Sequence, residues 1–137
     1  MKYQKIIDQY DKIYSDDTNP FGNNPLRIVR ALVEQLQKGT VLEIGAGAGR
    51  NSLFLAAQGF EVLATDISPV SVALMQRRAQ AEKLPLRVEL LNITEADLAE
   101  NFDAIICTFT LHHLERADAL ATLKKCKHTP SPAGIMF

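Results

Sequence analysis

The chain has 137 residues, of which 47% are hydrophobic and 23% are charged, a composition typical of one globular domain with a single core. Its 15 Lys and Arg and 16 Asp and Glu give a formal net charge of -1, so no basic field gathers nucleic acid or anionic lipid and no nucleic acid partner is expected. No apolar run reaches the roughly 18 residues of a membrane span, and the first residues lack the apolar core of a signal peptide. Because Cys107 and Cys126 form no closely spaced pair, we expect a reducing, cytoplasmic location. Because no apolar run is long enough to span a bilayer, we expect no membrane partner.

Residues 1–39 are predicted to be a helical segment that precedes a sheet core over residues 40–137, the two forming one domain. Charged and apolar residues mix over the start of the chain, where a first helix is expected. Asn24 and Pro25 have the form of a helix cap followed by proline at the first helical position, and apolar residues then recur at helical spacing. Gly39 is expected to close this second helix.

Strands and helices alternate over the rest of the chain. Short apolar runs predict strands at 40–44, 60–65, 86–90, 102–109 and 133–137, and helical spacing predicts helices at 51–58, 69–83 and around 120–123. This alternation predicts an α/β fold with a doubly wound, mostly parallel sheet and helices on both faces. Ligands of such sheets bind beyond the carboxyl ends of the strands.

The strongest motif is Val41-Leu-Glu-Ile-Gly-Ala-Gly-Ala-Gly-Arg-Asn51, which follows the first predicted strand. Its glycines allow a sharp turn and a close approach of a ligand to the backbone, while the next helix presents unpaired N–H groups. Asp66 lies 21 residues after Gly45, where a doubly wound fold places a carboxylate that accepts from ribose hydroxyls. A dinucleotide turn needs its third glycine at position 50, which is Arg50 here, so a nicotinamide cofactor is disfavoured.

The glycine motif, Asp66 and a third strand that ends at Leu91-Asn92-Ile93 resemble the class I S-adenosylmethionine-dependent methyltransferases, which have a Rossmann-like fold. More narrowly, residues 43–52 and Leu111-His112-His113-Leu114 are similar to the small tellurite-resistance-type methyltransferases. The resemblance implies S-adenosyl-L-methionine as the cofactor and a small-molecule or inorganic methyl acceptor.

The resemblance also implies where the cofactor binds. The glycine turn would pass under its methionine part, Asp66 would hold the ribose, and Thr108 would border the sulfur. Asn92 replaces an Asp that reads the adenine amino group in many members, and its carbonyl oxygen is expected to make the same contact more weakly. The implied cofactor-binding residues are Glu43, Gly45, Ala46, Gly47, Arg50, Asn51, Asp66, Ile67, Asn92, Ile93 and Thr108.

Methyl transfer from a sulfonium is a direct displacement, so alignment and exclusion of water are expected to carry the rate. His113 is the candidate catalytic base, and an ordinary loop histidine is the alternative interpretation. Tyr10 and Tyr14 have two open interpretations, as a cover for the cofactor or as packing on the sheet. The spacing of the histidines and cysteines matches no structural zinc site, and no metal is predicted.

The resemblance further implies two strands after the fifth, whereas this chain ends at Phe137, so a C-terminally truncated form of the fold is expected. Residues 133–137 are apolar and carry no charge or proline that would discourage pairing, and they predict self-association through this strand. The alternative function is a cofactor-binding domain that is inactive by itself.

Overall fold

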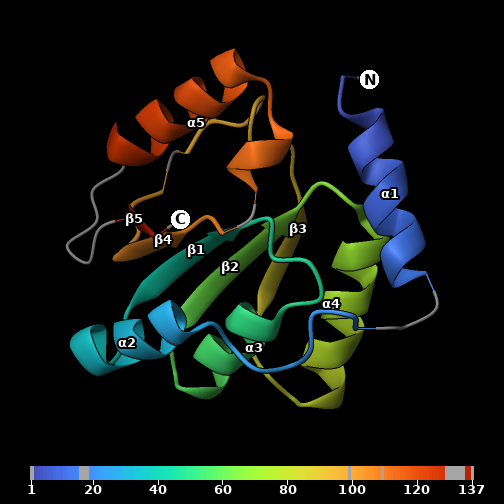
Figure 1. Ribbon diagram of the computed structural model, residues 1–137. Helices are drawn as coiled ribbons and strands as arrows, with labels where there is room; N and C mark the ends of the chain where they lie inside the picture. Colours follow the sequence, from blue (N-terminus) through green and yellow to red (C-terminus); the bar gives the residue numbers. More distant parts are fainter. Residues whose placement is uncertain (1, 16–18, 99, 109, 129–134, 137) are drawn as a thin grey trace.

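The computed structural model describes residues 2–15, 19–98, 100–108, 110–128 and 135–136. Its centre is a five-stranded sheet of order β3-β2-β1-β4-β5, in which every neighbouring pair is parallel (Figure 1). The strands are β1 (Thr40–Ile44), β2 (Glu61–Asp66), β3 (Arg87–Leu90), β4 (Ala104–Ile106) and β5 (Ile135–Met136). The predicted doubly wound parallel sheet is therefore confirmed.

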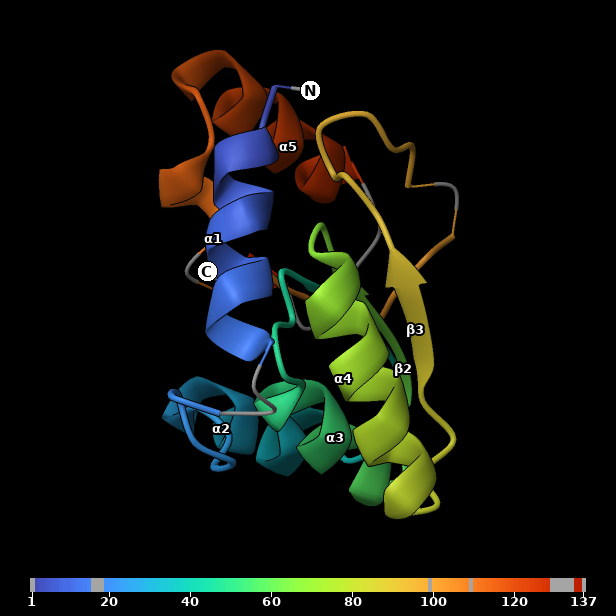
Figure 2. The ribbon, with the colours of Figure 1, turned by 90° about the vertical axis from the view of Figure 1, so that its right-hand side faces the viewer.

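Helices cover both faces of the sheet (Figure 1). They are α1 (Gln4–Tyr14), α2 (Arg27–Leu36), α3 (Arg50–Ala57), α4 (Pro69–Ala81), the 3-10 helix η1 (Leu111–His113) and α5 (Arg116–His128). Helices α2, α3 and α4 lie on one face and α5 lies on the other, while α1 runs beside α4 near the carboxyl ends of the strands (Figure 2). Within the described residues, no helix is long and apolar enough to cross a membrane.

The side chains of β1 alternate between the two faces of the sheet, and each face has its own apolar cluster. Val41 packs with Val29 and Leu55 against α2 and α3, whereas Leu42 packs with Cys126 on the face that α5 covers. Because successive strand residues point to opposite faces, a near-continuous apolar strand fits a sheet that is buried on both sides.

The boundaries of α2 differ from the prediction. The helix begins at Arg27, after Leu26, because the Leu26 N–H donates to Asn51 Oδ1 at 2.9 Å across the fold, and Asn24 and Pro25 stay outside it. It ends at Leu36, where Gln37 takes a left-handed φ of 63°, so Gly39 does not close it.

The other elements lie close to their predicted ranges. Ser68 caps α4 by accepting from the Ser71 N–H at 3.1 Å, with proline next to it, as predicted. Strand β4 is shorter than the apolar run that predicted it, and α5 is longer than expected, since it reaches from Arg116 to His128. Of the predicted fifth strand, residues 133, 134 and 137 lie outside the described residues.

Candidate functional site

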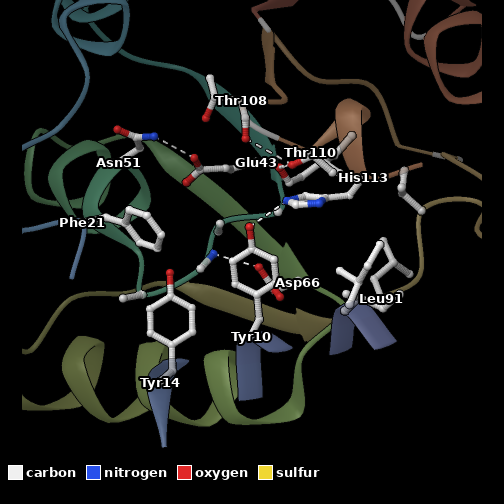
Figure 3. Close-up of a pocket in the computed structure, with 18 of the residues that line it drawn as sticks. Tyr10, Tyr14, Phe21, Glu43, Asn51, Asp66, Leu91, Thr108, Thr110 and His113 are labelled. Carbon is white, nitrogen blue, oxygen red and sulfur yellow. Dashed lines mark hydrogen bonds between the residues drawn. The ribbon is translucent and has the colours of Figure 1, made fainter. Parts of the chain in front are cut away.

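The carboxyl ends of four strands surround a cavity of about 440 Å³ (Figure 3). This volume falls within the roughly 300 to 1,000 Å³ that small-molecule sites occupy. Every residue that the sequence predicted to bind the cofactor lines this cavity, and so does His113. The edge of the sheet that the topology rule favours is therefore the edge that carries the cavity.

The glycine turn, residues 45–49, forms one wall. Gly45, Gly47 and Gly49 have φ angles of 72°, 60° and 88°, which favour glycine over residues with a side chain. A Cβ atom at Gly47 would lie 2.7 Å from Tyr14 Oη, and one at Gly45 would lie within 2.1 Å of Thr110 Oγ1. Glycine is thus required here both by the backbone and by close neighbours.

Asp66 ends β2 and connects the glycine turn to α4. Its Oδ2 accepts from the Gly47 N–H at 2.8 Å, and its Oδ1 accepts from the Ser68 N–H at 2.9 Å. Burial raises the pKa of Asp66, and these backbone N–H groups oppose that rise. Asp66 thus supports the start of α4, and each of its oxygens retains a lone pair that a ligand hydroxyl could use.

Glu43 is the penultimate residue of β1 and is buried. Its Oε2 accepts from Asn51 Nδ2 at 2.9 Å and its Oε1 accepts from Ser52 Oγ at 2.6 Å. Burial raises the pKa of Glu43 against the effect of these two donors. Since Asn51 Oδ1 also accepts from the Leu26 N–H, Glu43 and Asn51 join β1, α3 and the start of α2 at the wall of the cavity.

Asn92 lies in the turn after β3, lines the cavity, and uses its side-chain oxygen within that turn. Its Oδ1 accepts from the Thr94 N–H at 3.1 Å and from Thr94 Oγ1 at 2.7 Å. The same turn is closed by the N–H groups of Glu95 and Ala96, which both donate to the Asn92 carbonyl at 3.1 Å. In this structure the Asn92 side-chain oxygen caps the turn, and its expected contact with an adenine amino group stays a prediction.

Three aromatic side chains, Tyr10, Tyr14 and Phe21, form an aromatic roof over the glycine turn and Asp66 (Figure 3). The ring centroids of Tyr10 and Tyr14 are 6.3 Å apart, and those of Tyr14 and Phe21 are 6.4 Å apart. The sequence analysis left two interpretations of Tyr10 and Tyr14 open, a cover for the cofactor or packing on the sheet. In the structure both side chains line the cavity. Their spacing of four residues on one helix was the available signal.

Sequence reasoning missed Asp11, which fixes this roof. Asp11 Oδ1 accepts from Ser68 Oγ at 2.5 Å and from the Val70 N–H at 3.4 Å. These bonds hold α1 against the N-terminus of α4, where an acidic group is favourable. Nothing in the local sequence distinguishes Asp11 from the other charged residues of α1.

His113 contacts the roof from η1. Its Nε2 lies 2.7 Å from Tyr10 Oη, and the two rings meet edge to face at 5.4 Å. Burial first, and then the neighbouring His112, lower the pKa of His113. The lowered pKa of His113 favours the neutral imidazole, the state that a proton acceptor needs.

Thr108 and Arg50 also belong to the predicted cofactor-binding residues. Thr108 is buried beyond the end of β4, and Arg50 Nη1 donates to the Phe21 carbonyl at 3.1 Å. Arg50 thus holds Phe21, one of the three residues of the aromatic roof. Among the described residues, no group of three or more His, Cys, Asp or Glu is placed to hold a metal ion.

Comparisons with known proteins identify relatives. Residues 41–134 match the family model described as a methyltransferase domain. The chain is 37% identical over 87 residues to Hemagglutinin 1 of Eikenella corrodens, a match that covers 64% of this chain and 29% of that protein. It is 32% identical over 94 residues to the probable S-adenosyl-L-methionine-dependent methyltransferase TehB of Haemophilus influenzae, covering 69% of this chain and 33% of TehB.

Solved structures of methyltransferases also resemble this chain. The crystal structure of TehB superposes with a TM-score of 0.72 at 28% identity, over 89% of this chain and 41% of that chain. The magnesium protoporphyrin IX methyltransferase of Synechocystis with bound SAH superposes with a TM-score of 0.64 at 27% identity, over 72% of this chain and 46% of that chain.

The chain spans 33% or less of the length of the two curated relatives described above. The resemblance to class I S-adenosylmethionine-dependent methyltransferases that the sequence carries is confirmed by the family model and by TehB. The chain therefore belongs to the methyltransferase domain family.

Proposed function

We propose that this chain binds S-adenosyl-L-methionine in the cavity of Figure 3 and serves methyl transfer to a small-molecule or inorganic acceptor. One observation carries the proposal. Asp66 is held by the Gly47 and Ser68 N–H groups where β1 and β2 end, inside a cavity that also contains the glycine turn. A fixed, buried carboxylate beside accessible backbone suits a ligand with ribose hydroxyls next to a polar chain.

Different residues of the chain contact different parts of the cofactor. Asp66 accepts from the ribose, the glycine turn receives the methionine part, and Ile67 and Ile93 supply apolar walls for the adenine. When bound, the cofactor supplies an activated methyl group on a cationic sulfur. The faces of Tyr10 and Tyr14 suit a cation, since aromatic rings attract positive charge at close range.

The chain contributes to methyl transfer chiefly by orientation and by exclusion of water. The roof and η1 cover the cavity, which keeps water from the reacting atoms. For an acceptor that carries a proton, His113 Nε2 is the proposed site that receives it, after Tyr10 gives up its contact there.

The proposed acceptor class rests on the resemblance of the sequence to the small tellurite-resistance-type methyltransferases, and the size of the cavity supports it. The alternative interpretation, a cofactor-binding domain that is inactive by itself, is not favoured by the match to the methyltransferase family. A single domain made of residues 1–39 and 40–137, a cytoplasmic location, and self-association through residues 133–137 stay predictions.

Calorimetry with four ligands tests the proposal. We expect binding of S-adenosylmethionine and S-adenosylhomocysteine and no measurable binding of NAD or NADP, because Arg50 stands where a dinucleotide turn needs glycine. Tighter binding of NAD than of S-adenosylmethionine would overturn the assignment. Mass spectrometry of a cell extract incubated with labelled cofactor then identifies the acceptor by its added label.

A further inference from the structure

The cavity extends along α1 beyond the glycine turn. Tyr14 lies over that turn, and Tyr10, Ile6 and Tyr3 also line the cavity, at spacings of three or four residues toward the start of the helix. Since an α-helix rises about 1.5 Å per residue, Tyr3 lies roughly 16 Å from Tyr14 along the axis. This far end of the cavity is therefore the place for a methyl acceptor beside a cofactor at the glycine turn.

We call this end the acceptor compartment, and its walls are Tyr3, Ile6, Tyr10, His113 and Leu114. Two contacts close α1 against the residues that follow β4. The Glu115 N–H donates to Tyr3 Oη at 3.2 Å, and Tyr10 Oη lies 2.7 Å from His113 Nε2 (Figure 3). Because two phenol rings and two aliphatic side chains make most of these walls, the compartment suits an apolar molecule.

The acceptor compartment offers little to an anion. Among the described residues that line the cavity, Arg50 is the only Lys or Arg, and it lies beside the glycine turn at the start of α3. The N–H groups of residues 113–115 already donate to two backbone carbonyls at 3.1 Å and to Tyr3 Oη at 3.2 Å. An anion taken out of water needs a cation or free N–H donors, so the compartment disfavours a charged acceptor.

Tyr10 Oη and His113 Nε2 are the polar pair of this compartment. Burial first, and then the neighbouring His112, lower the pKa of His113, which favours the neutral ring. The Nε2 of a neutral ring accepts from the Tyr10 hydroxyl when Nδ1 carries the proton. Since the Tyr10 side chain is itself a phenol, a phenolic hydroxyl fits at His113 Nε2.

We propose that the acceptor is an uncharged aromatic molecule with a phenolic hydroxyl that displaces Tyr10 Oη from His113 Nε2, and that an inorganic oxyanion is not the acceptor. This inference rests on the proposed function and narrows its acceptor class. The acceptor hydroxyl gives its proton to His113 Nε2 and its oxygen bonds to the methyl carbon, while the electron pair of the broken C–S bond stays on the sulfur.

The test measures binding of three probes to the chain saturated with S-adenosylhomocysteine, by NMR titration near pH 7, so that it does not depend on turnover. The probes are 4-methylphenol, which reproduces the side chain of Tyr10, benzoate, which carries a negative charge on the same ring, and tellurite. The dissociation constant of 4-methylphenol should be at least about tenfold lower than that of benzoate, and tellurite should show no saturable binding. Benzoate or tellurite that binds as tightly as 4-methylphenol, or 4-methylphenol that does not bind, would overturn the inference.

Ile6→Lys places a cation in the acceptor compartment and should reverse the order, so that benzoate binds more tightly than 4-methylphenol. Ile28→Lys is the matched control, because it makes the same substitution at an exposed residue of α2 outside the walls of the cavity. Its ratio of dissociation constants should equal that of the wild type. An Ile6→Lys variant that keeps the wild-type ratio would place the acceptor elsewhere.

Tyr10→Phe tests the hydroxyl, because it keeps the ring and removes the group that occupies His113 Nε2. The affinity for 4-methylphenol should rise roughly three- to tenfold, whereas the affinity for 4-methylanisole, which has no hydroxyl to donate, should change little. An unchanged or weaker affinity for 4-methylphenol would show that it does not use Nε2. A wild-type chain that does not bind S-adenosylhomocysteine would instead overturn the proposed function, and this inference with it.

Discussion

Asp66 has the strongest claim to contact a ligand of any single residue in the cavity, because both of its oxygens are fixed by backbone N–H groups. Asp66→Ala should weaken binding of S-adenosylhomocysteine by about 1.5 to 3 kcal/mol through lost charge-assisted hydrogen bonds. Asp66→Asn, which keeps one acceptor oxygen, should lose less. Calorimetry measures both, and an Asp66→Ala variant with unchanged affinity would place the ligand elsewhere.

The pH dependence of binding reports the same carboxylate. Burial raises the pKa of Asp66 above its ordinary value of about 3.9, so acid protonates it and weakens acceptance from ribose hydroxyls at a higher pH than usual. Affinity should therefore fall on acidification through that raised pKa. The folded chain also binds this proton more readily than the unfolded chain, so the contribution of Asp66 to stability is largest below the unfolded pKa and is lost as the pH rises through the folded pKa.

Asp66→Asn isolates this effect, because the buried Glu43, whose pKa is also raised, titrates in both proteins. The difference in ligand affinity between the wild type and Asp66→Asn should disappear at low pH, where Asp66 is protonated. This difference should increase as the pH rises. Parallel profiles over the whole range would show that Asp66 does not need its charge for binding.

His113 tests whether alignment or proton transfer limits turnover. His113→Ala should reduce turnover by less than about tenfold if alignment carries the rate, whereas a general base typically contributes about 10² to 10⁴. His112→Ala, in the same 3-10 helix, is the matched control. Single-turnover rates with an acceptor identified from the labelled extract decide this point, and a thousandfold loss with intact cofactor affinity would make His113 catalytic.

At the scale of elements, the glycine turn and α1 depend on one another through Gly47 and Tyr14. Gly47→Ala places a Cβ at a φ of 60° and 2.7 Å from Tyr14 Oη, so it combines backbone strain with a clash against α1. Gly59→Ala is the matched control, since its φ is 93° and nothing lies within 4 Å of the added Cβ. The control should lose about 1 to 2 kcal/mol of unfolding free energy from strain alone, and Gly47→Ala should lose more.

The double variant Gly47→Ala with Tyr14→Phe separates the two causes. Removal of the hydroxyl leaves the ring carbon Cζ at 3.5 Å from the added Cβ, which is ordinary contact. Denaturant unfolding should therefore show recovery of part of the loss in the double variant, relative to the sum of the two single variants. If the losses of unfolding free energy of the two single variants simply add up in the double variant, the Tyr14 hydroxyl does not clash with the added Cβ.

The sequence predicted the elements that local pattern determines and missed those that distant partners determine. Strand β1 was predicted at Thr40–Ile44 as observed, because its apolar run ends in glycines that no strand continues. The predicted start of α2 was wrong, and the residue before the helix, Leu26, is held by Asn51, twenty-five residues away. The contact of Asn92 Oδ1 with Thr94 is local, because the two residues are two positions apart, and the sequence analysis missed this turn.

At the scale of the whole molecule, the cavity joins elements that are far apart in the sequence. Tyr3 Oη donates to Asp118 and accepts from the Glu115 N–H, and Lys2 forms ion pairs with Asp118 and Glu115, so α1 is tied to the start of α5. Asp11 ties the same helix to α4. A ligand in the cavity contacts the strand ends and this helical cover together, and it should stabilise the domain as one unit.

Ligand-dependent thermal unfolding tests that coupling. A ligand at one hundred times its dissociation constant stabilises the folded state by about 2.7 kcal/mol, which corresponds to roughly 5 to 10 °C in the midpoint for a domain of this size. S-adenosylhomocysteine should produce this shift in a single cooperative transition, and NAD at the same concentration should produce none. Asp66→Ala at the wild-type ligand concentration should retain at most about half of the free energy, because its weaker affinity lowers the ratio of ligand to dissociation constant. A shift with S-adenosylhomocysteine that splits the transition into two steps would mean that α1 unfolds independently of the sheet, and then the contacts of Tyr3 and Asp11 would not couple the cover to the core.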